Sequence, residues 1–285
     1  MQPPGSGVRG ATGRRLYFSA GERVVFAETK EPALSEAARR LFPAYEVPQP
    51  KLVDADHVSV TVTRKRGEHV IISPDAPPVS CRSRMDALVA LEFALSRTLA
   101  ASFSDHVHLH ASGAVVDGRA VIALGRSGAG KSSLAASMLA RGFRTLGDDT
   151  VFLNSRCFVE PFKRLMKLST EVLEELGVAP ESTIHWDREW PEAWLDPVDG
   201  PGWAEEAPVA VIVLAQHDPA ASMSLEPVTS SDALNALLHS VMISGMPAGT
   251  GFDRLLHVAE SAKTFWLRFR SSVEAAELLS SMPNE

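Results

Sequence analysis

One stretch constrains this chain more than any other: residues 125–132 read Gly-Arg-Ser-Gly-Ala-Gly-Lys-Ser, the pattern G-x-x-x-x-G-K-S. An apolar run of strand type, Arg119–Leu124, comes before it, and a run of helix formers, Ser132–Arg141, follows it. Between a strand and a helix, such a loop lets backbone N–H groups converge on phosphate oxygens, and the helix N-terminus attracts negative charge. The sequence therefore predicts a phosphate-binding loop whose ligand is a nucleoside triphosphate.

Two side chains of this loop have the chemistry that a triphosphate needs. Lys131 can reach the β- and γ-phosphates, and the hydroxyl of Ser132 can ligate Mg²⁺. The alternative is a glycine-rich turn that binds nothing, but the flanking strand and helix argue against it. The residues expected to hold the nucleotide are Gly125, Arg126, Ser127, Gly128, Ala129, Gly130, Lys131, Ser132 and Ser133.

Composition excludes several other classes of protein. The 285 residues carry a net charge of −7 and no long basic stripe, so we expect no nucleic-acid partner. Cys81 and Cys157 are the only cysteines, so a disulfide framework and a zinc site are not expected. The longest apolar run, Val209–Ala215, is too short to span a bilayer, and the N-terminus has no apolar segment of signal-peptide type. We therefore expect a cytoplasmic protein without a membrane partner.

The order of residue patterns predicts an α/β fold in three segments. Residues 1–14 are a Gly/Pro/Arg-rich tail, residues 15–100 a small α+β module that ends in a linking helix, and residues 101–285 the ATP-binding domain. Residues 74–78 read as a loop, and residues 181–206, rich in Trp, Pro and acid, as a long irregular surface segment. That segment could be a substrate lid or an oligomer contact.

Individual elements follow from periodicity and breakers. Helices are expected at residues 33–42, 84–102, 132–141, 170–176, 230–239, 254–260 and 272–279. Strands are expected at residues 16–18, 23–27, 57–63, 68–73, 119–124, 208–215, 225–229 and 263–270, with a hairpin at Asp117-Gly118 ahead of the phosphate loop and short strands on either side of the Asp148-Asp149 pair.

Three side chains outside the loop are candidates for the chemistry: Asp148, Asp149 and His110. Asp148 and Asp149 stand together at a predicted strand end, which suits Mg²⁺ binding and general-base work. Because neighbouring side chains of a strand point apart, we expect distinct roles for the two. His108 and His110 share one face of the strand before the hairpin, and spacing alone favours a structural role for them.

Taken together, His110-Ala-Ser-Gly, the loop at 125–132, Arg141-Gly142 and Asp148-Asp149-Thr-Val151 resemble the catalytic domain of HPr kinase/phosphorylase. This resemblance implies a P-loop kinase core of HPr kinase/PEP carboxykinase type, a mixed sheet with flanking helices, preceded by the small α+β module. It also implies ATP and Mg²⁺ as cofactors and a homo-oligomer.

The resemblance also implies roles for single residues. Asp149 corresponds to the catalytic base that takes the proton of an acceptor serine, Lys131 to the phosphate-binding lysine, and His110 to a catalytic histidine beside the phosphate. Ser132 and Asp148 correspond to the metal side of the site. The implied activity is transfer of the γ-phosphate of ATP to a serine hydroxyl of a peptide or small protein.

The sequence departs from the family at several points. Ser133 stands where HPr kinases carry Glu, and the second metal-binding glutamate has only Glu174 as a counterpart. The catalytic arginine has three candidates, Arg254, Arg268 and Arg270. These departures favour the divergent relatives, among them the lasso peptide kinases, which phosphorylate a serine of a precursor peptide.

Three other functions stay open from the sequence. The first is a kinase of a small hydroxylated metabolite such as free serine. The second is a P-loop ATPase or nucleotide-binding module; the absence of the L-S-G-G-Q pattern argues against it. The third is a pseudokinase scaffold; the presence of Lys131, Ser132 and Asp149 argues against it.

Overall fold

The computed structural model describes residues 14–20, 23–49, 57–74, 76–179, 182–187, 189–244 and 248–282. The chain divides into two compact units, Met1–Ser102 and Phe103–Glu285. The boundary lies two residues beyond the one expected from the sequence, between residues 100 and 101. The predicted tail, residues 1–14, falls outside the described residues except for Arg14.

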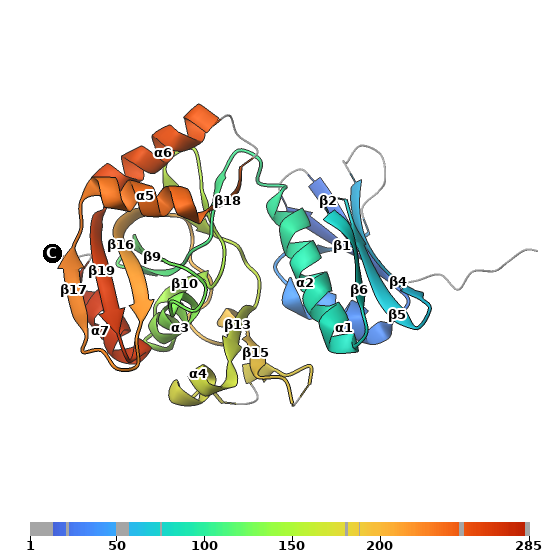
Figure 1. Ribbon diagram of the computed structural model, residues 1–285. Coiled ribbons are helices and arrows are strands. Elements are labelled where there is room, and N and C mark those ends of the chain that lie inside the picture. The colour runs from blue at the N-terminus through green and yellow to red at the C-terminus, as the bar shows by residue number, and fades with distance from the viewer. Residues whose placement is uncertain are drawn as a thin grey trace, which may run out of the picture. The chain divides into compact units, whose positions relative to one another are not determined.

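The first unit is a six-stranded sheet in the order β3-β1-β2-β4-β5-β6, with helices α1 and α2 packed on it (Figure 1). All its strand pairs are antiparallel except β2 and β4. Its elements are β1 Arg14–Ala20, β2 Arg23–Thr29, α1 Pro32–Leu41, β3 Glu46–Val47, β4 His57–Lys65, β5 Glu68–Ser73, β6 Ala76–Cys81 and α2 Arg84–Ala100.

Two local features shape this unit. Helix α2 begins with a capping box, in which the Ser83 hydroxyl accepts from the backbone N–H of Asp86 and the Asp86 carboxylate accepts from the N–H of Ser83. Residues 76–78, predicted as part of a loop, instead belong to β6, so that prediction is wrong for them. Strand β6 is the edge of the sheet, where Pro77 and Pro78 need not donate to a neighbouring strand.

The second unit holds a ten-stranded mixed sheet, a separate three-stranded sheet and the flanking helices. The elements before the middle of the unit are β7 Val107–Leu109, β8 Ser112–Val116, β9 Arg119–Leu124, α3 Lys131–Ala140, β10 Arg144–Gly147, β11 Val151–Leu153, β12 Phe158–Pro161, β13 Met166–Ser169 and α4 Thr170–Glu175. Those after it are β14 Thr183–Ile184, β15 Glu192–Leu195, the 3₁₀ turn Pro197–Asp199, β16 Ala207–His217, β17 Ser224–Pro227, α5 Ser230–Ser240, β18 Val241–Ser244, α6 Ala248–Ser261, β19 Lys263–Phe269 and α7 Ser272–Ser281.

Strand β16 joins the two halves of the large sheet. Its first residues pair with β12, and through β12 with β11, β7 and β18, while its later residues lie between β9 and β19 and run parallel to both. The carboxyl ends of β9, β16 and β19 therefore meet at one edge. In an α/β sheet that edge is where ligands bind.

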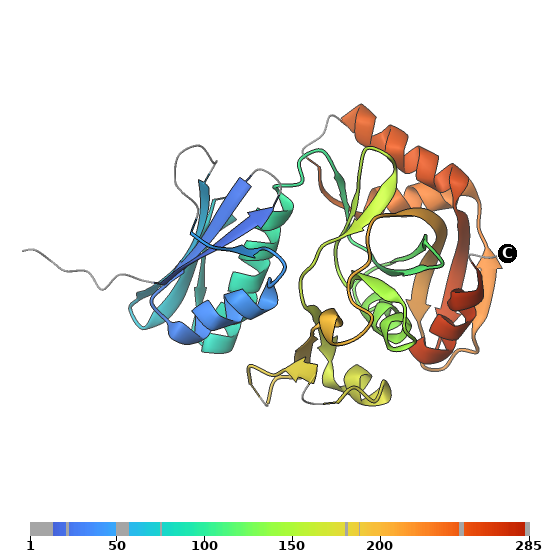
Figure 2. The same ribbon diagram turned by 180° about the vertical axis from the view of Figure 1, so that it is seen from behind.

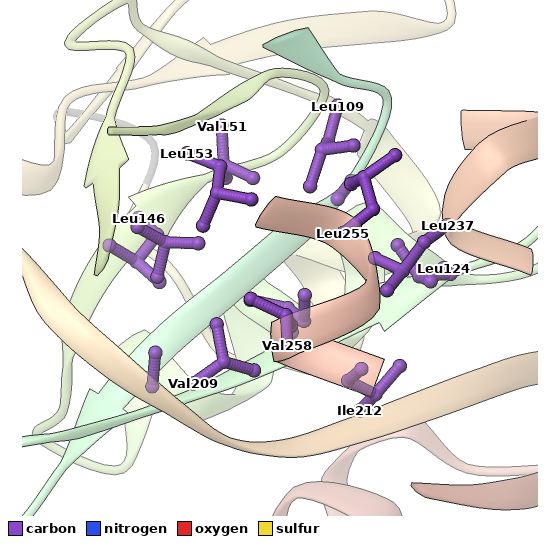
Figure 3. Close-up of a cluster of buried hydrophobic side chains, with 14 of the residues drawn as sticks. Leu109, Leu124, Leu146, Val151, Leu153, Val209, Ile212, Leu237, Leu255 and Val258 are labelled. Atoms are coloured by element: carbon purple, nitrogen blue, oxygen red, sulfur yellow. The ribbon is translucent and has the colours of Figure 1, made fainter. Parts of the chain in front are cut away.

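Alternation along β9 and β16 divides the core into two layers. Ile122 and Ile212 face the layer under α5 and α6, whereas Val121 and Val213 face the layer under α3 and α7. Figure 1 shows both helix pairs, and Figure 2 shows the same arrangement from behind. In Figure 3, side chains of the strands meet those of α5 and α6 in the first layer, among them Leu109, Leu124, Leu146, Val151, Leu153, Leu237, Leu255 and Val258.

Residues 182–187 and 189–206 differ from the irregular surface segment that the sequence predicts. Strands β14 and β15 pair with each other and with β13 as a three-stranded sheet. Trp194 is fully buried, and Ala193 and Leu195 pack with residues of α3 and α4. The prediction was wrong because acidic residues and prolines dominate the composition of this stretch, and they hide a four-residue strand that carries its apolar side chains.

Among the described residues, no helix combines the length and the apolar character that crossing a bilayer requires.

Candidate phosphate-transfer site

The phosphate loop, Gly125–Ser133, connects β9 to the first turn of α3 at the sheet edge where parallel strands end. Gly128 and Gly130 have φ of 78° and 86°, in the left-handed region that favours glycine. A Cβ at Gly130 would lie 2.7 Å from Cζ of Phe269 and 3.0 Å from Cβ of His217. The loop therefore passes so close to β16 and β19 that only glycine fits at position 130.

Lys131 lies buried at the start of α3, with its ammonium turned back onto the loop. Its Nζ donates to the carbonyl oxygens of Gly125, at 2.8 Å, and Arg126, at 3.2 Å. Burial lowers the pKa of Lys131, and the negative charge of Asp149 opposes that shift. The cation thus occupies the concave side of the loop, within the electrostatic reach of Asp149.

Two hydroxyls fix the start of α3 to the neighbouring strands. Ser132 Oγ donates to the backbone carbonyl of Asp148 at 3.0 Å, and Ser112 Oγ donates to the carbonyl of Lys131 at 2.6 Å. Ser112 begins β8 and Asp148 follows β10. The predicted metal-ligating serine is therefore tied directly to the acidic pair.

Asp148 is buried, with an exposed fraction of 5%. Its Oδ1 accepts from Nη2 of Arg164 at 3.1 Å, and its Oδ2 accepts from the backbone N–H of Lys167 at 2.9 Å. These bonds hold the segment before β13 against the end of β10. The predicted role of Asp148 at the metal stays a prediction, and any metal would share these oxygens with Arg164 and the Lys167 amide.

Asp149 turns the other way, toward His110. Its Oδ1 lies 3.1 Å from His110 Nδ1, and the same nitrogen lies 3.0 Å from the Asp149 carbonyl oxygen. Because both neighbours of Nδ1 are acceptors, we assign the proton to that nitrogen. Burial raises the pKa of Asp149, but the His110 hydrogen bond and the positive charges of Arg164, His110 and Lys131 outweigh it and lower the pKa to about 2.

The two histidines before the hairpin part company in the structure. His108 is buried, with Nε2 at 2.9 Å from the Phe103 carbonyl and its ring against Phe152, and this burial lowers its pKa. His110 lies just beyond the end of β7 and keeps 35% of its side chain exposed beside Asp149. His108 is therefore a structural residue, and His110 belongs to the site.

A cavity of about 910 Å³ opens next to the phosphate loop, between the carboxyl end of β16 and α5. Its lining includes Gly125 and Arg126 from the loop, His110 from the candidate site, and Asp218, His239 and Trp266. This volume is within the range of small-molecule sites and exceeds what inorganic phosphate needs.

Sequence patterns missed one residue of this site, Arg164. It has no motif around it, and only the fold brings its buried guanidinium to Asp148 and within electrostatic reach of Asp149. Three arginines were candidates for the catalytic arginine. Arg254 donates to the Asp105 carbonyl at 2.6 Å, and Arg268 lines a hollow with Glu226 on β17. The backbone carbonyl of Arg270 lies 3.1 Å from His217 Nε2.

The predicted second metal glutamate, Glu174, lies on α4. Among the described residues, no group of three or more His, Cys, Asp or Glu side chains forms a ready-made metal site. Protein ligands for Mg²⁺ are nevertheless few, because this ion keeps several waters and takes phosphate oxygens. One hydroxyl, that of Ser132, next to an acidic pair fits such a site.

Comparison with protein-family models and with curated proteins finds no match to this sequence. Among solved structures that match, the HPr(Ser) kinase/phosphatase from Coxiella burnetii is similar over 62% of this chain and 88% of its own, with 12% identity and a TM-score of 0.33. A likeness of this size does not fix the activity of this chain.

Proposed function

We propose that the protein is an ATP-dependent kinase that transfers the γ-phosphate to a serine hydroxyl of a peptide or small protein. The observation that carries the proposal is the Asp149–His110 pair, 3.1 Å apart, which Ser132 links through the Asp148 backbone to the end of the phosphate loop. A loop that served only to bind nucleotide would not need an ionised carboxylate held beside it.

The transfer step divides between the loop and the pair. The backbone N–H groups of the loop and the ammonium of Lys131 hold the β- and γ-phosphates and neutralise their charge. The acceptor hydroxyl lies on the Asp149 carboxylate, which receives its proton as the new O–P bond forms. The bond between the γ-phosphorus and the β-phosphate oxygen breaks in line with it, and ADP leaves.

The low pKa of Asp149 bears on how it acts. A carboxylate with a pKa of about 2 is ionised at every physiological pH but is a weak base. Two changes on nucleotide binding strengthen it: phosphate oxygens bring negative charge to the site, and they draw the Lys131 ammonium toward themselves. Both raise the pKa of Asp149. In a loose transition state, orienting the hydroxyl matters more than early proton removal.

His110 holds the Asp149 carboxylate in place through Nδ1. Because His110 also lines the cavity, it can face the transferring phosphoryl group. Ser132 and, in our proposal, Asp148 are the residues that would hold Mg²⁺. When bound with ATP, this ion would supply charge neutralisation for the phosphates. The carbonyl bond of Ser132 leaves the hydroxyl lone pairs for that role.

The acceptor that we propose is a serine in a peptide, including a precursor peptide of the lasso type. The motif resemblance from His110 to Val151 supports a serine acceptor, and the 46% exposure of the Asp149 side chain leaves it open to a macromolecular substrate. Free serine and other small hydroxylated metabolites compete with this proposal.

One experiment tests both the activity and the acceptor. The full-length protein is incubated with γ-labelled ATP, Mg²⁺ and either serine-ending peptides or free serine, and the phosphate is located by mass spectrometry. We expect label on a peptide serine. Label on free serine alone would contradict the acceptor class, and release of inorganic phosphate without transfer to any hydroxyl would contradict the kinase.

The Asp149→Asn variant tests the proposed base. We expect it to bind ATP as the wild type does but to lose about 10²–10⁴-fold in the rate of transfer, which is the range for general-base catalysis. Asp253→Asn, an exposed carboxylate on α6, is the matched control and should keep its rate. A near wild-type rate for Asp149→Asn in single-turnover measurements would remove Asp149 from the mechanism.

A further inference from the structure

The cavity beside the phosphate loop is lined in part by residues that the transfer mechanism does not use. These residues are Trp266 on β19, Asp218 just beyond β16, and Asp232 and His239 on α5. We propose that they bind the nucleoside half of the triphosphate, with the nucleobase on the Trp266 ring and the ribose hydroxyls on Asp218. This inference rests on the proposed function, since it places the ligand of that same site.

Continuity with the loop is the first step. Gly125, Arg126, Gly128 and Ala129 all line the cavity, so a ligand held by the loop extends directly into it. A triphosphate alone would leave most of the volume of about 910 Å³ unfilled. The remainder of a nucleotide is the group that is covalently attached to the phosphates and must occupy adjacent space.

Exclusion of the acceptor is the second step. The acceptor hydroxyl has to approach Asp149, and Asp149 is not one of the residues that line the cavity. Of the proposed transfer residues outside the loop, only His110 lines the cavity. The rest of the lining is thus left to the donor nucleotide.

Charge supports the same direction of the nucleotide. Lys131 and the loop amides attract phosphate oxygens, whereas the carboxylates of Asp218 and Asp232 repel them. Asp218 follows His217, whose N–H donates to the Ala129 carbonyl at 3.0 Å, so it stands beside the loop, where the ribose next to the phosphates lies.

The same residues have the hydrogen-bonding character that a nucleoside needs. The Asp218 carboxylate is held by the N–H of Ala220, at 3.0 Å, and can accept from ribose hydroxyls, a role that acidic residues have in dinucleotide sites. His239 Nδ1 lies 2.8 Å from the Asn235 carbonyl, so Nδ1 donates there and Nε2 remains for a contact with the nucleoside. Ribose hydroxyls and base amino groups supply the donors.

Trp266 is the surface for the base. It is 49% exposed although it stands between the half-buried Phe265 and the buried Leu267, and it lies on the sheet face toward α5, in register with Leu214. A large aromatic ring left open at a cavity wall is a stacking platform, because every nucleobase has a π-face.

Calorimetric titration of the full-length protein with ATP and with inorganic tripolyphosphate, both with Mg²⁺, tests the inference. We expect Trp266→Ala to weaken ATP binding about tenfold, the size of one lost stacking contact. Its tripolyphosphate binding should stay at the wild-type value, which also shows that the loop has folded. Trp266→Phe should retain most of the ATP affinity, and Phe252→Ala, another exposed aromatic residue, should retain all of it.

The outcomes separate this inference from the kinase itself. Equal ATP affinity in the wild type and Trp266→Ala would overturn the nucleoside site and leave the kinase proposal standing, as would equal weakening of ATP and tripolyphosphate. A wild type that binds neither ligand would overturn both. For the ribose, Asp218→Asn should lower the affinity for ATP but not for 2′,3′-dideoxy-ATP; an equal effect on the two would remove Asp218 from the site.

Discussion

At the scale of single residues, the site depends on the hydrogen bonds that His110 Nδ1 donates to Asp149. His110 Nδ1 is within hydrogen-bonding distance of both the carboxylate and the carbonyl of the same residue, so the ring restrains the side chain and the backbone of Asp149 together. Removal of the imidazole therefore changes the geometry and the acidity of the carboxyl at once.

We expect His110→Ala to raise the pKa of Asp149, because the variant lacks the His110 hydrogen bond, the interaction that most strongly counteracts the effect of burial. Asp149 contributes in its ionised form, so the variant loses activity as the pH falls toward the raised pKa, whereas the wild type, with a pKa of about 2, does not. The ratio of wild-type to variant transfer rates should grow several-fold between pH 7 and pH 5. A ratio that is constant with pH would show that His110 acts only through geometry or on the phosphoryl group.

At the scale of elements, the close approach of the phosphate loop to β16 and β19 makes Gly130 a structural requirement. Gly130→Ala puts a methyl group 2.7 Å from Phe269 at a left-handed φ of 86°. We expect a loss of about 2–4 kcal/mol in the free energy of unfolding, from strain plus overpacking, and loss of ATP binding.

The control for Gly130→Ala is Gly142→Ala. Gly142 has a similar φ, 96°, but no atom lies within 4 Å of its virtual Cβ. It should therefore lose only the cost of the left-handed conformation, about 1 kcal/mol, and keep ATP binding. Urea denaturation measures both variants, and equal destabilisation would show that the contact with Phe269 is relieved by movement of the ring.

Another pair of elements, the start of β7 and strand β12, is linked by a histidine between two carboxylates. His106 lies 2.6 Å from Asp105 through Nδ1 and 3.4 Å from Glu160 through Nε2. Burial lowers the pKa of His106, but the Glu160 hydrogen bond and the charges of Asp105 and Glu160 raise it above its ordinary value. The His106 hydrogen bond in turn lowers the pKa of Glu160.

These two shifts set the pH range in which the link stabilises the fold. The His106 contribution is complete below its ordinary pKa of 6.5 and is lost as the pH rises through the raised value; that of Glu160 is complete above 4.5 and is lost as the pH falls. His106→Gln should therefore cost most, about 1–2 kcal/mol, between about pH 4.5 and 6.5, and less at pH 8. Thermal unfolding over pH, with His257→Gln on α6 as control, measures this; a cost independent of pH would contradict the charged pair.

Sequence patterns predicted the elements whose periodicity is strong and local. The strand before the phosphate loop, the helix after it, the hairpin at Asp117-Gly118 and the long strand at 208–215 are all present, because each is specified by neighbours in the chain. The three-stranded sheet of β13, β14 and β15 could not be predicted in this way. Its strands are two to four residues long, and they exist because distant partners pair with them.

The candidate site divides in the same manner. Lys131, Ser132, Asp149 and His110 stand in motifs and are brought together by the fold. Arg164 could not be found, since its part depends on a buried pairing with Asp148 across the loop that precedes β13. The other residues that line the cavity were missed for a similar reason: Asp218, His239 and Trp266 come from three elements that meet only at the sheet edge.

At the scale of the whole molecule, each unit has its own buried core, and all the proposed site residues lie in the second unit. Phe18 is fully buried in the first unit, where its ring meets Phe42 edge-on. We expect Phe18→Ala to reduce the free energy of unfolding of the first unit by about 3–5 kcal/mol. Calorimetry should show that transition at lower temperature, while ATP at 100 times its Kd still stabilises the second unit by about 2.7 kcal/mol.

Retained ATP stabilisation in Phe18→Ala is the decisive part of that measurement. Its loss, in a protein whose second unit still unfolds cooperatively, would show that the first unit contributes to nucleotide binding. The corresponding change in the second unit, Leu237→Ala on α5, should instead lower the temperature of the transition that ATP stabilises.

Two carbonyl oxygens of the loop hold the ammonium of Lys131. These carbonyls therefore compete with any anion that binds the lysine. An incoming anion has to replace those carbonyls before it gains the lysine, so the apparent affinity for any anion is the difference between two attractions. A triphosphate offers several charged oxygens in the right spacing and displaces the carbonyls; a single small anion offers too little. The lysine held by its own loop thus favours triphosphates over small single anions such as inorganic phosphate.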